Sequence, residues 1–313
     1  MSISVLPELA VGPYPRPDYR DLRRYVPDRT PVDIDLSDNT NLWGTHPAAL
    51  QMIRDAVGAE VSRYPSPYAD ELREAAARRF GVSEDQVTTG PGSDGVIDSL
   101  WRAAAQFGGT ISWPGPTFSM IAPFCAMNGR IAHEVPWAEA HDDPMTLLAR
   151  DPVLVYLCRP NNPSGAQLES GWVETLLERI GETGPLVVFD EAYAEYAGES
   201  MIERAVSHPR VLVTRTMSKA WGLAGMRVGL GIGSAELIGE IEKTRGPYAI
   251  SRLGERAAAA ALRDDSPWLD ERVAETLQNR DRLVEELRSR GADPLPSRAN
   301  FIFVPTPVGT AQA

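Results

Sequence analysis

Cysteine, long apolar runs and clustered positive charge are all scarce in this sequence, and each scarcity argues against a class of protein. The chain has two cysteines, Cys125 and Cys158, which are too few for a disulfide framework. Its apolar runs are much shorter than a membrane span, and residues 1–9 lack a basic, apolar signal segment. We therefore expect a reducing cytoplasm, no membrane partner, and two buried thiols.

Negative charge outweighs positive charge along the whole chain. The formal net charge is −12 at pH 7, and no basic run is present, so we expect no nucleic-acid partner. Hydrophobic residues make up 43% and charged residues 24% of the 313 positions, which is typical of a globular protein. This length is sufficient for one large and one small domain.

Short apolar or β-branched runs alternate with helical stretches from about residue 85 onward. Such a pattern predicts an α/β fold with a mostly parallel sheet covered by helices on both faces. Ligands on such sheets bind at the carboxyl ends of the strands. The predicted strands are 86–89, 110–112, 153–157, 186–189, 211–214 and 228–231.

The segments that flank this region suggest three parts. Residues 1–35 are rich in proline and predict an irregular N-terminal arm. A large domain is expected over 36–250, with its first helices near 46–58 and 68–80. A small C-terminal domain is expected over 251–313. It would begin with long helices to about residue 290, followed by a strand at 299–305.

The most informative segment is 214–229, which reads TRTMSKAWGLAGMRVG. It places Lys219 among small and apolar residues, where burial lowers a lysine pKa and makes the neutral amine a nucleophile. Such an amine forms a Schiff base with an aldehyde, while Ser218 and Arg227 are groups that bind phosphate. An aldehyde that carries a phosphate describes pyridoxal 5'-phosphate (PLP). The alternative is a Gly/Ser loop with an incidental lysine.

This segment resembles the Schiff-base motif of the fold-type I PLP enzymes in the aminotransferase class I/II superfamily. Its pattern S-K-x-x-x-L-A-G-x-R-x-G is most similar to the histidinol-phosphate aminotransferase branch. The resemblance implies a fold-type I PLP-dependent transferase with Lys219 as its catalytic lysine. It also implies that Thr216, Ser218 and Arg227 bind the cofactor.

The run VVFDEAY at 187–193 reads as a buried strand that ends in a carboxylate. A carboxylate beneath a pyridine nitrogen keeps that nitrogen protonated, so that the ring acts as an electron sink. The family resemblance gives this catalytic role to Asp190, and gives Tyr193 a hydrogen bond to the cofactor 3′-oxygen. The alternative for Asp190 is a helix N-cap.

The loop RPNNPSG at 159–165 resembles the N-P-N-N-P-[ST]-G loop of the same superfamily, with Arg159 in place of an asparagine. The resemblance implies that Asn162 also bonds the cofactor 3′-oxygen. Taken alone, the segment could be a plain Pro/Asn/Gly turn. Asn162 lies 28 residues before Asp190, and this spacing favours the cofactor role.

Two further segments resemble cofactor contacts of the family. TTGPGSDG at 88–95 follows a strand and opens a helix, where backbone amides can meet an anion. It resembles the family's phosphate cup, which implies Ser93, Asp94 and Gly95 as contacts, although Gly95 replaces the usual glutamate. PGPTF at 114–118 resembles the segment whose aromatic ring stacks on the pyridine, which implies Phe118; the alternative is a core aromatic.

The remaining resemblances concern the substrate and the partner subunit. DNTNLWG at 38–44 is loosely similar to the family's N-E-N-P-x-G segment, which implies that Asn39 and Trp43 bind substrate. The segment NFIFV at 300–304 matches the family's N-F strand and implies the same for Asn300. RYP at 63–65 implies a homodimer in which Tyr64 reaches the partner's cofactor; the alternative is local aromatic packing.

The family's C-terminal R-[IV]-[ST]-[IV]-G strand has no counterpart after residue 304. Its arginine usually holds the substrate carboxylate, which leaves two alternatives: a truncated small domain, or a different mode of substrate binding. A truncation predicts an exposed sheet edge and impaired substrate binding. No metal site is expected. The cofactor segments all precede Val228, so PLP binding should be unaffected.

The predicted reaction is transamination between an amine donor, first of all L-histidinol phosphate, and a 2-oxo acid such as 2-oxoglutarate. Three alternatives use the same cofactor residues. They are an aminotransferase for aromatic or specialised-metabolite amino acids, a phosphothreonine-type decarboxylase, and a non-catalytic PLP-binding paralogue. A PLP-sensing regulatory domain is disfavoured because no DNA-binding segment is present.

Overall fold

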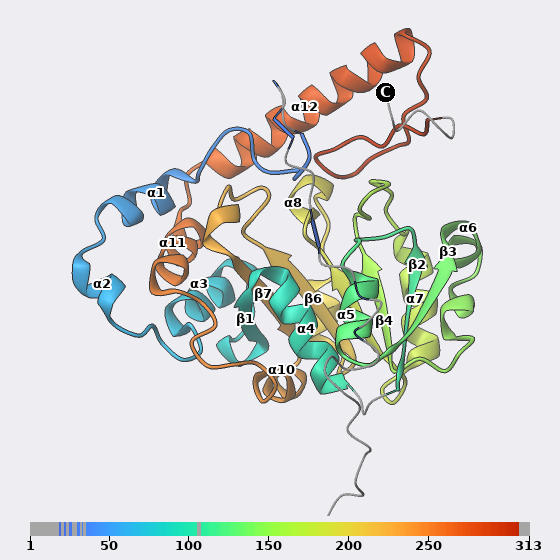
Figure 1. The fold of residues 1–313 in the computed structure, drawn as a ribbon, viewed down its shortest axis with the longest axis horizontal. Helices are drawn as coiled ribbons and strands as arrows, with labels where there is room; N and C mark the ends of the chain where they lie inside the picture. Colours follow the sequence, from blue (N-terminus) through green and yellow to red (C-terminus); the bar gives the residue numbers. More distant parts are fainter. Residues whose placement is uncertain are drawn as a thin grey trace, which may run out of the picture.

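The computed structural model describes residues 36–104 and 108–306, with scattered positions between Tyr19 and Asp33; most of the predicted arm at 1–35 lies outside this range. At its centre is a seven-stranded sheet (Figure 1). The strands are β1 (Val87–Pro91), β2 (Thr110–Gly115), β3 (Ile131–Pro136), β4 (Leu154–Cys158), β5 (Leu186–Asp190), β6 (Val211–Thr216) and β7 (Val228–Gly233).

The sheet has the order β1-β7-β6-β5-β4-β2-β3. Strand β7 runs antiparallel to both of its neighbours, and the other pairs are parallel. The prediction of a mostly parallel α/β sheet is therefore confirmed. Strand β3 was not predicted, because it lies at the edge and most of its side chains are exposed or half-buried.

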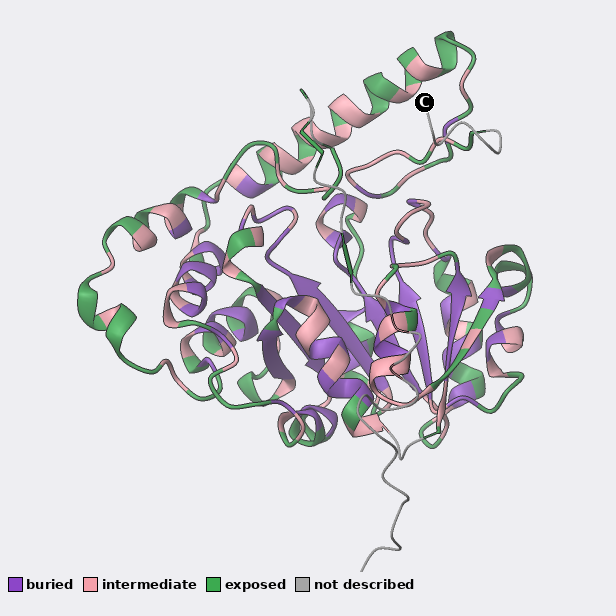
Figure 2. Cartoon of the chain, in the orientation of Figure 1, coloured by how far each residue is buried: buried purple, intermediate pink, exposed green. Residues whose placement is uncertain are grey.

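Both faces of the central strands are buried, as Figure 2 shows. On β4, Tyr156 and Cys158 face one core, while Val155 and Leu157 face the other. The first core is closed by α4 (Gly92–Ala104), α5 (Ile121–Met127) and α10 (Ala235–Glu242), and the second by α7 (Ser170–Ile180) and α9 (Ile202–Ser207). Continuous apolar strands follow from this arrangement, because every residue meets a helix layer.

A third core joins the segments that precede and follow the sheet. It contains buried residues of α3 (Asp70–Phe80) and α11 (Arg252–Arg263) together with Trp221 from the loop that carries Lys219. Helix α12 (Trp268–Ser289) extends across the top of the molecule in Figure 1, and Leu269 is its one buried residue. The long helices predicted up to residue 290 are thereby confirmed.

Two sequence predictions differ from the structure. The helix expected at 46–58 is split into α1 (Pro47–Arg54) and α2 (Gly58–Ser62), because Val57 adopts an extended conformation. The strand expected at 299–305 is wrong, since the described part of this segment lacks a paired ladder and is tied instead by single bonds such as Leu295 N–H to the Phe303 carbonyl. A strand forms only where a neighbour accepts its backbone bonds.

The remaining elements are short: α6 (Trp137–Asp142), α8 (Ala194–Ala197), and the 3₁₀ turns η2 (Glu84–Gln86), η3 (Pro144–Leu148) and η4 (Ala224–Met226). None of the helices in the described ranges is long and apolar enough to cross a bilayer.

Candidate active site

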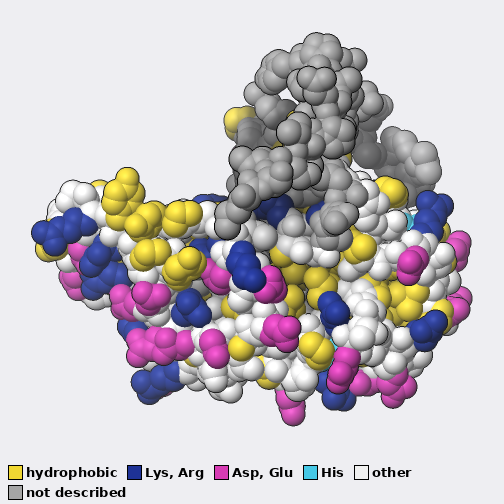
Figure 3. Space-filling view, turned by 90° about the horizontal axis from the view of Figure 1, so that it is seen from below, with side chains coloured by type: hydrophobic (Ala, Val, Ile, Leu, Met, Phe, Trp, Pro, Cys, Tyr) yellow, Lys and Arg dark blue, Asp and Glu magenta, His cyan; other side chains and the backbone are white. Residues whose placement is uncertain are grey.

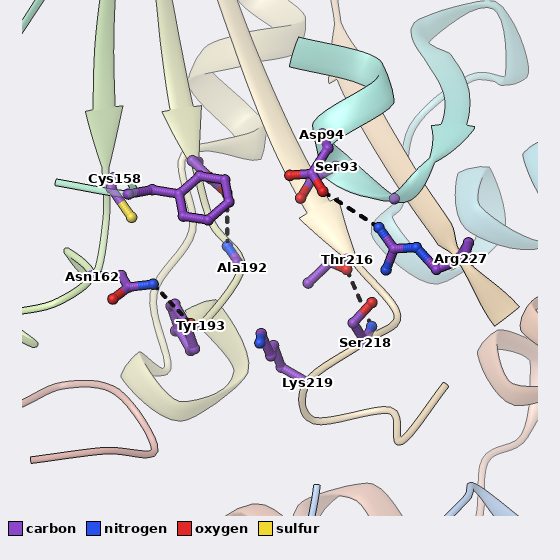
Figure 4. Close-up of a pocket in the computed structure, with 13 residues that line it drawn as sticks. Ser93, Asp94, Cys158, Asn162, Ala192, Tyr193, Thr216, Ser218, Lys219 and Arg227 are labelled. Atoms are coloured by element: carbon purple, nitrogen blue, oxygen red, sulfur yellow. Dashed lines mark hydrogen bonds and ion pairs between the residues drawn. The ribbon is translucent and has the colours of Figure 1, made fainter. Parts of the chain in front are cut away.

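A cavity of about 130 Å³ lies where β4, β5 and β6 end and α4 begins (Figure 4). Most of the residues that the sequence suggested for the cofactor line it, although they come from six separate segments. The residues that line the cavity are Gly92, Ser93, Asp94, Phe118, Cys158, Asn162, Asp190, Ala192, Tyr193, Thr216, Ser218, Lys219 and Arg227. Their convergence follows from the parallel strands, whose carboxyl ends share one edge of the sheet.

One end of the cavity is suited to a phosphate. Ser93 and Asp94 stand in the first turn of α4, and the Arg227 guanidinium lies 3.4 Å from the Asp94 carboxylate. The Ser218 hydroxyl oxygen is buried and has no hydrogen-bond partner in the described part of the chain. A helix N-terminus, an arginine and an unsatisfied hydroxyl together provide donors for an anion.

Gly95 lies further along α4 and does not line the cavity. A Cβ atom at this position would lie 2.3 Å from Cδ of Pro91, so the proline ring occupies the space that any other side chain would need. A glutamate side chain at position 95 would clash with Pro91, so glycine in place of the family's glutamate fits the presence of this proline. The adjacent backbone is also tightly packed, because a Cβ on Gly229 would lie 2.1 Å from the Gly92 carbonyl carbon.

Asp190 ends β5 and is 4% exposed. Its Oδ1 accepts hydrogen bonds from the Ala192 amide and the Thr214 hydroxyl, both at 3.2 Å, and its Oδ2 accepts one of 2.7 Å from the Tyr156 hydroxyl. Burial raises the pKa of Asp190 to about 6, against the opposing effect of these donors. Tyr156 and Thr214 were missed from the sequence, where they read as ordinary strand residues.

Tyr193 lies between the loop that carries Asn162 and the segment that carries Asn39. Its hydroxyl oxygen accepts hydrogen bonds of 3.4 Å from the Asn162 and Asn39 side-chain amides. Burial raises the pKa of Tyr193 above its ordinary value, so the phenol stays protonated and remains a donor. Phe118 contributes its partly buried ring to the same cavity.

Lys219 points into the cavity from the loop after β6 (Figure 4). Its amine donates a 2.6 Å hydrogen bond to the Asp38 backbone carbonyl and lies 5.8 Å from the centre of the Tyr193 ring. Burial lowers the pKa of the Lys219 amine, although nearby carboxylates, with Asp38 and Asp94 foremost, oppose this shift. A lowered pKa favours the neutral, nucleophilic amine.

A buried ion-pair network supports the loop that carries Lys219. Arg215 bonds Glu191 at 3.0 Å and Glu195 at 2.7 Å, and the Trp221 indole N–H donates to the same Glu195 carboxylate. The network joins β6 to the segment that follows β5. It therefore fixes the loop of Lys219 relative to the segment that carries Asp190 and Tyr193.

The three predicted substrate residues share a second, larger cavity. Asn39 reaches the cofactor cavity through Tyr193, and its carbonyl accepts a 3.1 Å bond from the Asn300 side chain. Asn39, Trp43 and Asn300 all line the larger cavity, which measures about 690 Å³ and lies between residues 36–43, α12 and residues 300–304. Trp43 is directed to α12, where its indole N–H donates to Thr276 at 3.1 Å.

The predicted partner-subunit residue and the two cysteines also have defined positions. Tyr64 is 80% exposed, does not line the cofactor cavity of its own chain, and packs against Tyr248 with ring centres 4.9 Å apart. Cys125 and Cys158 are both buried free thiols, as predicted. Cys158 additionally lines the cofactor cavity, which the sequence did not indicate.

The fold and the site together define a class of protein. A half-buried lysine amine, a buried carboxylate and an anion-binding helix terminus meet at the carboxyl edge of a mostly parallel sheet, and this arrangement is that of a fold-type I PLP-dependent enzyme. The residues present fit the cofactor, since the unsatisfied Ser218 hydroxyl and Arg227 suit its phosphate, and Lys219 suits its aldehyde.

The chain belongs to the aminotransferase class I and II family, whose model matches residues 31–311. It is 35% identical to histidinol-phosphate aminotransferase 2 of Carboxydothermus hydrogenoformans, over 91% of this chain and 83% of that protein. It is also 35% identical to an aromatic amino acid aminotransferase of Thermobifida fusca, over 93% and 84%.

One solved structure is similar to this chain in both fold and sequence. The histidinol-phosphate aminotransferase of Sinorhizobium meliloti, determined in complex with PLP, superposes with a TM-score of 0.79 at 31% identity. The match covers 85% of this chain and 74% of that one. The predicted family, enzyme class and cofactor are thus confirmed: the protein is a PLP-dependent aminotransferase.

Proposed function

We propose that the protein transfers the amino group of L-histidinol phosphate to a 2-oxo acid such as 2-oxoglutarate. The observation that carries the transferase chemistry is the Lys219 amine, held in one cavity with Asp190 and the anion-binding end. The choice of donor is supported by the relatives of 31–35% identity that are named for it.

The residues have separate roles in this proposal. When bound, PLP supplies an electron sink for the charge that develops at the substrate α-carbon. Lys219 would hold the cofactor through its aldehyde, and as a free amine it would take the proton from the substrate α-carbon. Asp190 holds a proton on the ring nitrogen, while Asn162 and Tyr193 hydrogen-bond the cofactor 3′-oxygen. Ser93, Ser218 and Arg227 bind the phosphate.

An aromatic amino acid is the second candidate donor, because the Thermobifida fusca aminotransferase for such substrates is as similar as the first relative reported above. The same residues would perform the chemistry, so the two proposals differ only in the group that the donor carries beyond its α-carbon. Intact Lys219, Asp190 and Arg227 argue against loss of cofactor binding, and turnover of a donor distinguishes an enzyme from a paralogue that only binds PLP.

A half-reaction with purified protein and PLP tests these proposals directly. Addition of histidinol phosphate should convert the visible absorbance of lysine-bound PLP to that of pyridoxamine phosphate, and 2-oxoglutarate should restore it. Phenylalanine and tyrosine serve as parallel donors. Conversion by aromatic amino acids alone would replace the first proposal with the second, and absence of conversion by any donor would contradict both.

We further propose a homodimer, supported by exposed apolar side chains near α2. Val57, Val61, Tyr64, Tyr68 and Tyr248 are each at least 43% exposed. Figure 3 shows hydrophobic side chains gathered at the end of the molecule that carries α1 and α2. Exposed apolar groups of this kind mark protein interfaces, and Tyr64 would contact the partner's cofactor. Sedimentation at several protein concentrations tests this association.

The buried free thiols of Cys125 and Cys158 support a reducing compartment such as the cytoplasm.

A further inference from the structure

Tyr156 is the donor closest to the Asp190 carboxylate, yet it does not line the cofactor cavity. Its side chain is fully buried in the core beneath the site. On the paired strands β4 and β5, Tyr156 lies opposite Val188, and Cys158 lies opposite Asp190. Since residues two apart share a face of a strand, Tyr156 approaches Asp190 from the interior of the sheet.

The two oxygens of Asp190 have different surroundings. Oδ1 accepts two bonds of 3.2 Å, from Thr214 and the Ala192 amide, whereas Oδ2 has the Tyr156 hydroxyl as its only donor among the described residues, at 2.7 Å. Loss of this one phenol hydroxyl would therefore leave half of a buried carboxylate without a partner. Such a loss destabilises the charged form of the carboxylate more than its neutral form.

Toward the Asp190 carboxylate, the Tyr156 phenol acts as the donor. Burial and the adjacent Asp190 charge raise the pKa of Tyr156 well above its ordinary value, so the hydroxyl keeps its proton. Its bond to Asp190 also opposes the effect of burial on the carboxylate. The tyrosine thus favours the ionised state that a protonated ring nitrogen requires.

We propose that Tyr156 is a positioning residue for the transamination, which fixes the Asp190 carboxylate and keeps it ionised from a place that the cofactor does not touch. This inference rests on the proposed role of Asp190 towards the cofactor ring. The Tyr156 hydroxyl also interacts with the Cys158 thiol, whose own pKa is raised by burial, so that thiol stays neutral. The other titratable groups that face Asp190 are Asp94, Tyr193 and Lys219, and all three are retained when Tyr156 is changed. The contribution of Tyr156 through the carboxylate should therefore depend on pH in the same way as that of Asp190.

The variant Tyr156→Phe tests the proposal because the ring still fills the core and only the hydroxyl is lost. Tyr196→Phe is the matched control for the pH dependence of PLP binding, since Tyr196 is also buried but lines the larger cavity and does not contact Asp190. Asp190→Asn serves as the reference for loss of the carboxylate. PLP affinity is measured on each apoprotein as a function of pH, and kcat and KM are measured on the reconstituted enzyme.

Loss of a donor to the charged form raises the Asp190 pKa. The acid limb of the PLP-binding profile, which is the pH range where affinity falls as the pH is lowered, should therefore move up by about one pH unit in Tyr156→Phe. We expect kcat to fall about ten-fold while KM for the donor changes less than about two-fold. An unmoved acid limb, or an equal shift in Tyr196→Phe, would overturn the inference.

The Asp190→Asn variant separates failure of this inference from failure of the Asp190 assignment. If Asp190→Asn loses affinity and activity but Tyr156→Phe matches the wild type, then the role of Tyr156 alone is wrong. If Asp190→Asn itself keeps the wild-type pH profile, the assignment of Asp190 is wrong and the inference about Tyr156 is overturned with it.

Discussion

The amine of Lys219 donates a 2.6 Å hydrogen bond to the backbone carbonyl of Asp38, a residue 181 positions earlier in the chain. This bond connects the lysine to the N-terminal segment that also carries Asn39. The segment is held at its other side by the bond from Asn300 to the Asn39 carbonyl. A Schiff-base nitrogen carries fewer N–H groups than a lysine amine, so we expect capture of an aldehyde by Lys219 to weaken this bond and thereby to couple the lysine to the segment that carries Asn39.

Lysine is rare in this chain, which makes the assignment of Lys219 simple to test. The sequence contains only Lys219 and Lys243, although it has 31 lysines and arginines in total. Borohydride reduction of the PLP-loaded protein should fix the cofactor on Lys219 and not on Lys243, whose side chain is 67% exposed and paired with Glu240. Peptide mass spectrometry locates the label. Lys219→Ala should lose it and Lys243→Arg should keep it; label on Lys243 alone would refute the assignment.

The lowered pKa of Lys219 predicts a pH dependence for PLP capture. A depressed pKa means that the amine loses its proton, and becomes nucleophilic, at a lower pH than an ordinary lysine. The rate at which the apoprotein captures PLP should therefore reach its plateau at a lower pH than the rate for free N-acetyl-lysine. Stopped-flow absorbance measures both rates. Coincident pH profiles would show that burial does not control this amine.

Asn39 is expected to affect the amine donor more than the cofactor. Asn39 lines the larger cavity and reaches the cofactor cavity only through the Tyr193 hydroxyl, and its backbone is left-handed with φ of 50°. In Asn39→Ala we expect KM for the donor to rise about five-fold or more, because a polar contact and a favourable conformer are both lost. Asn39→Gly retains the conformation and separates the two effects. A change confined to PLP affinity would contradict this prediction.

The cofactor site was largely predictable because each of its segments carries a local signal. Asp190 ends a strand, Lys219 and Asn162 follow strands, and each lies in a motif of distinctive composition. The parallel sheet brings these strand ends together. Tyr156 was not predictable in the same way. It lies inside the apolar run of β4, where a buried tyrosine cannot be distinguished from a core residue until its neighbour on β5 is known.

The errors in the predicted fold have a common physical origin. The segment at 299–305 has the composition of a strand, but a strand also needs a partner for its backbone bonds, and the sequence of one segment does not supply that information. Strand β3 shows the opposite case. Its exposed position at the sheet edge means that its sequence lacks an apolar pattern, but pairing with β2 still makes it a strand. Long-range pairing decided both cases.

Arg159, which replaces the family's asparagine, should contribute to stability. Its side chain is nearly fully buried; its Nε donates to the Leu168 carbonyl at 3.1 Å and its Nη2 bonds Glu199 at 2.9 Å. Arg159→Met should lower the free energy of unfolding by about 1–3 kcal/mol, since a buried carbonyl loses its donor.

Glu199→Gln is the matched control for the ion pair alone. Glu199 is 46% exposed, so this change should cost less than about 1 kcal/mol. Urea unfolding at one fixed protein concentration compares the variants, because association contributes to apparent stability. Equal losses in the two variants would show that the ion pair, and not the bond to Leu168, accounts for the contribution of Arg159.

The exposed position of Tyr64 leads to a prediction about mixed dimers. If Tyr64 serves the partner's cofactor, Tyr64→Ala and Lys219→Ala each disable the homodimer. A hybrid of the two then has one site with both defects and one intact site. Random exchange of subunits makes half of the dimers hybrids, so mixing two weakly active variants should restore about a quarter of wild-type activity.

The alternative reading of Tyr64 predicts a different outcome. If Tyr64 acted only within its own chain, where it packs on Tyr248, each site of the hybrid would carry one defect and mixing would restore nothing. Tyr248→Ala mixed with Lys219→Ala is the control for general weakening of the interface. Activity is measured after exchange in mild denaturant and its removal, with each variant alone as the baseline. Recovery in the first mixture and not in the control would place Tyr64 at the partner's active site.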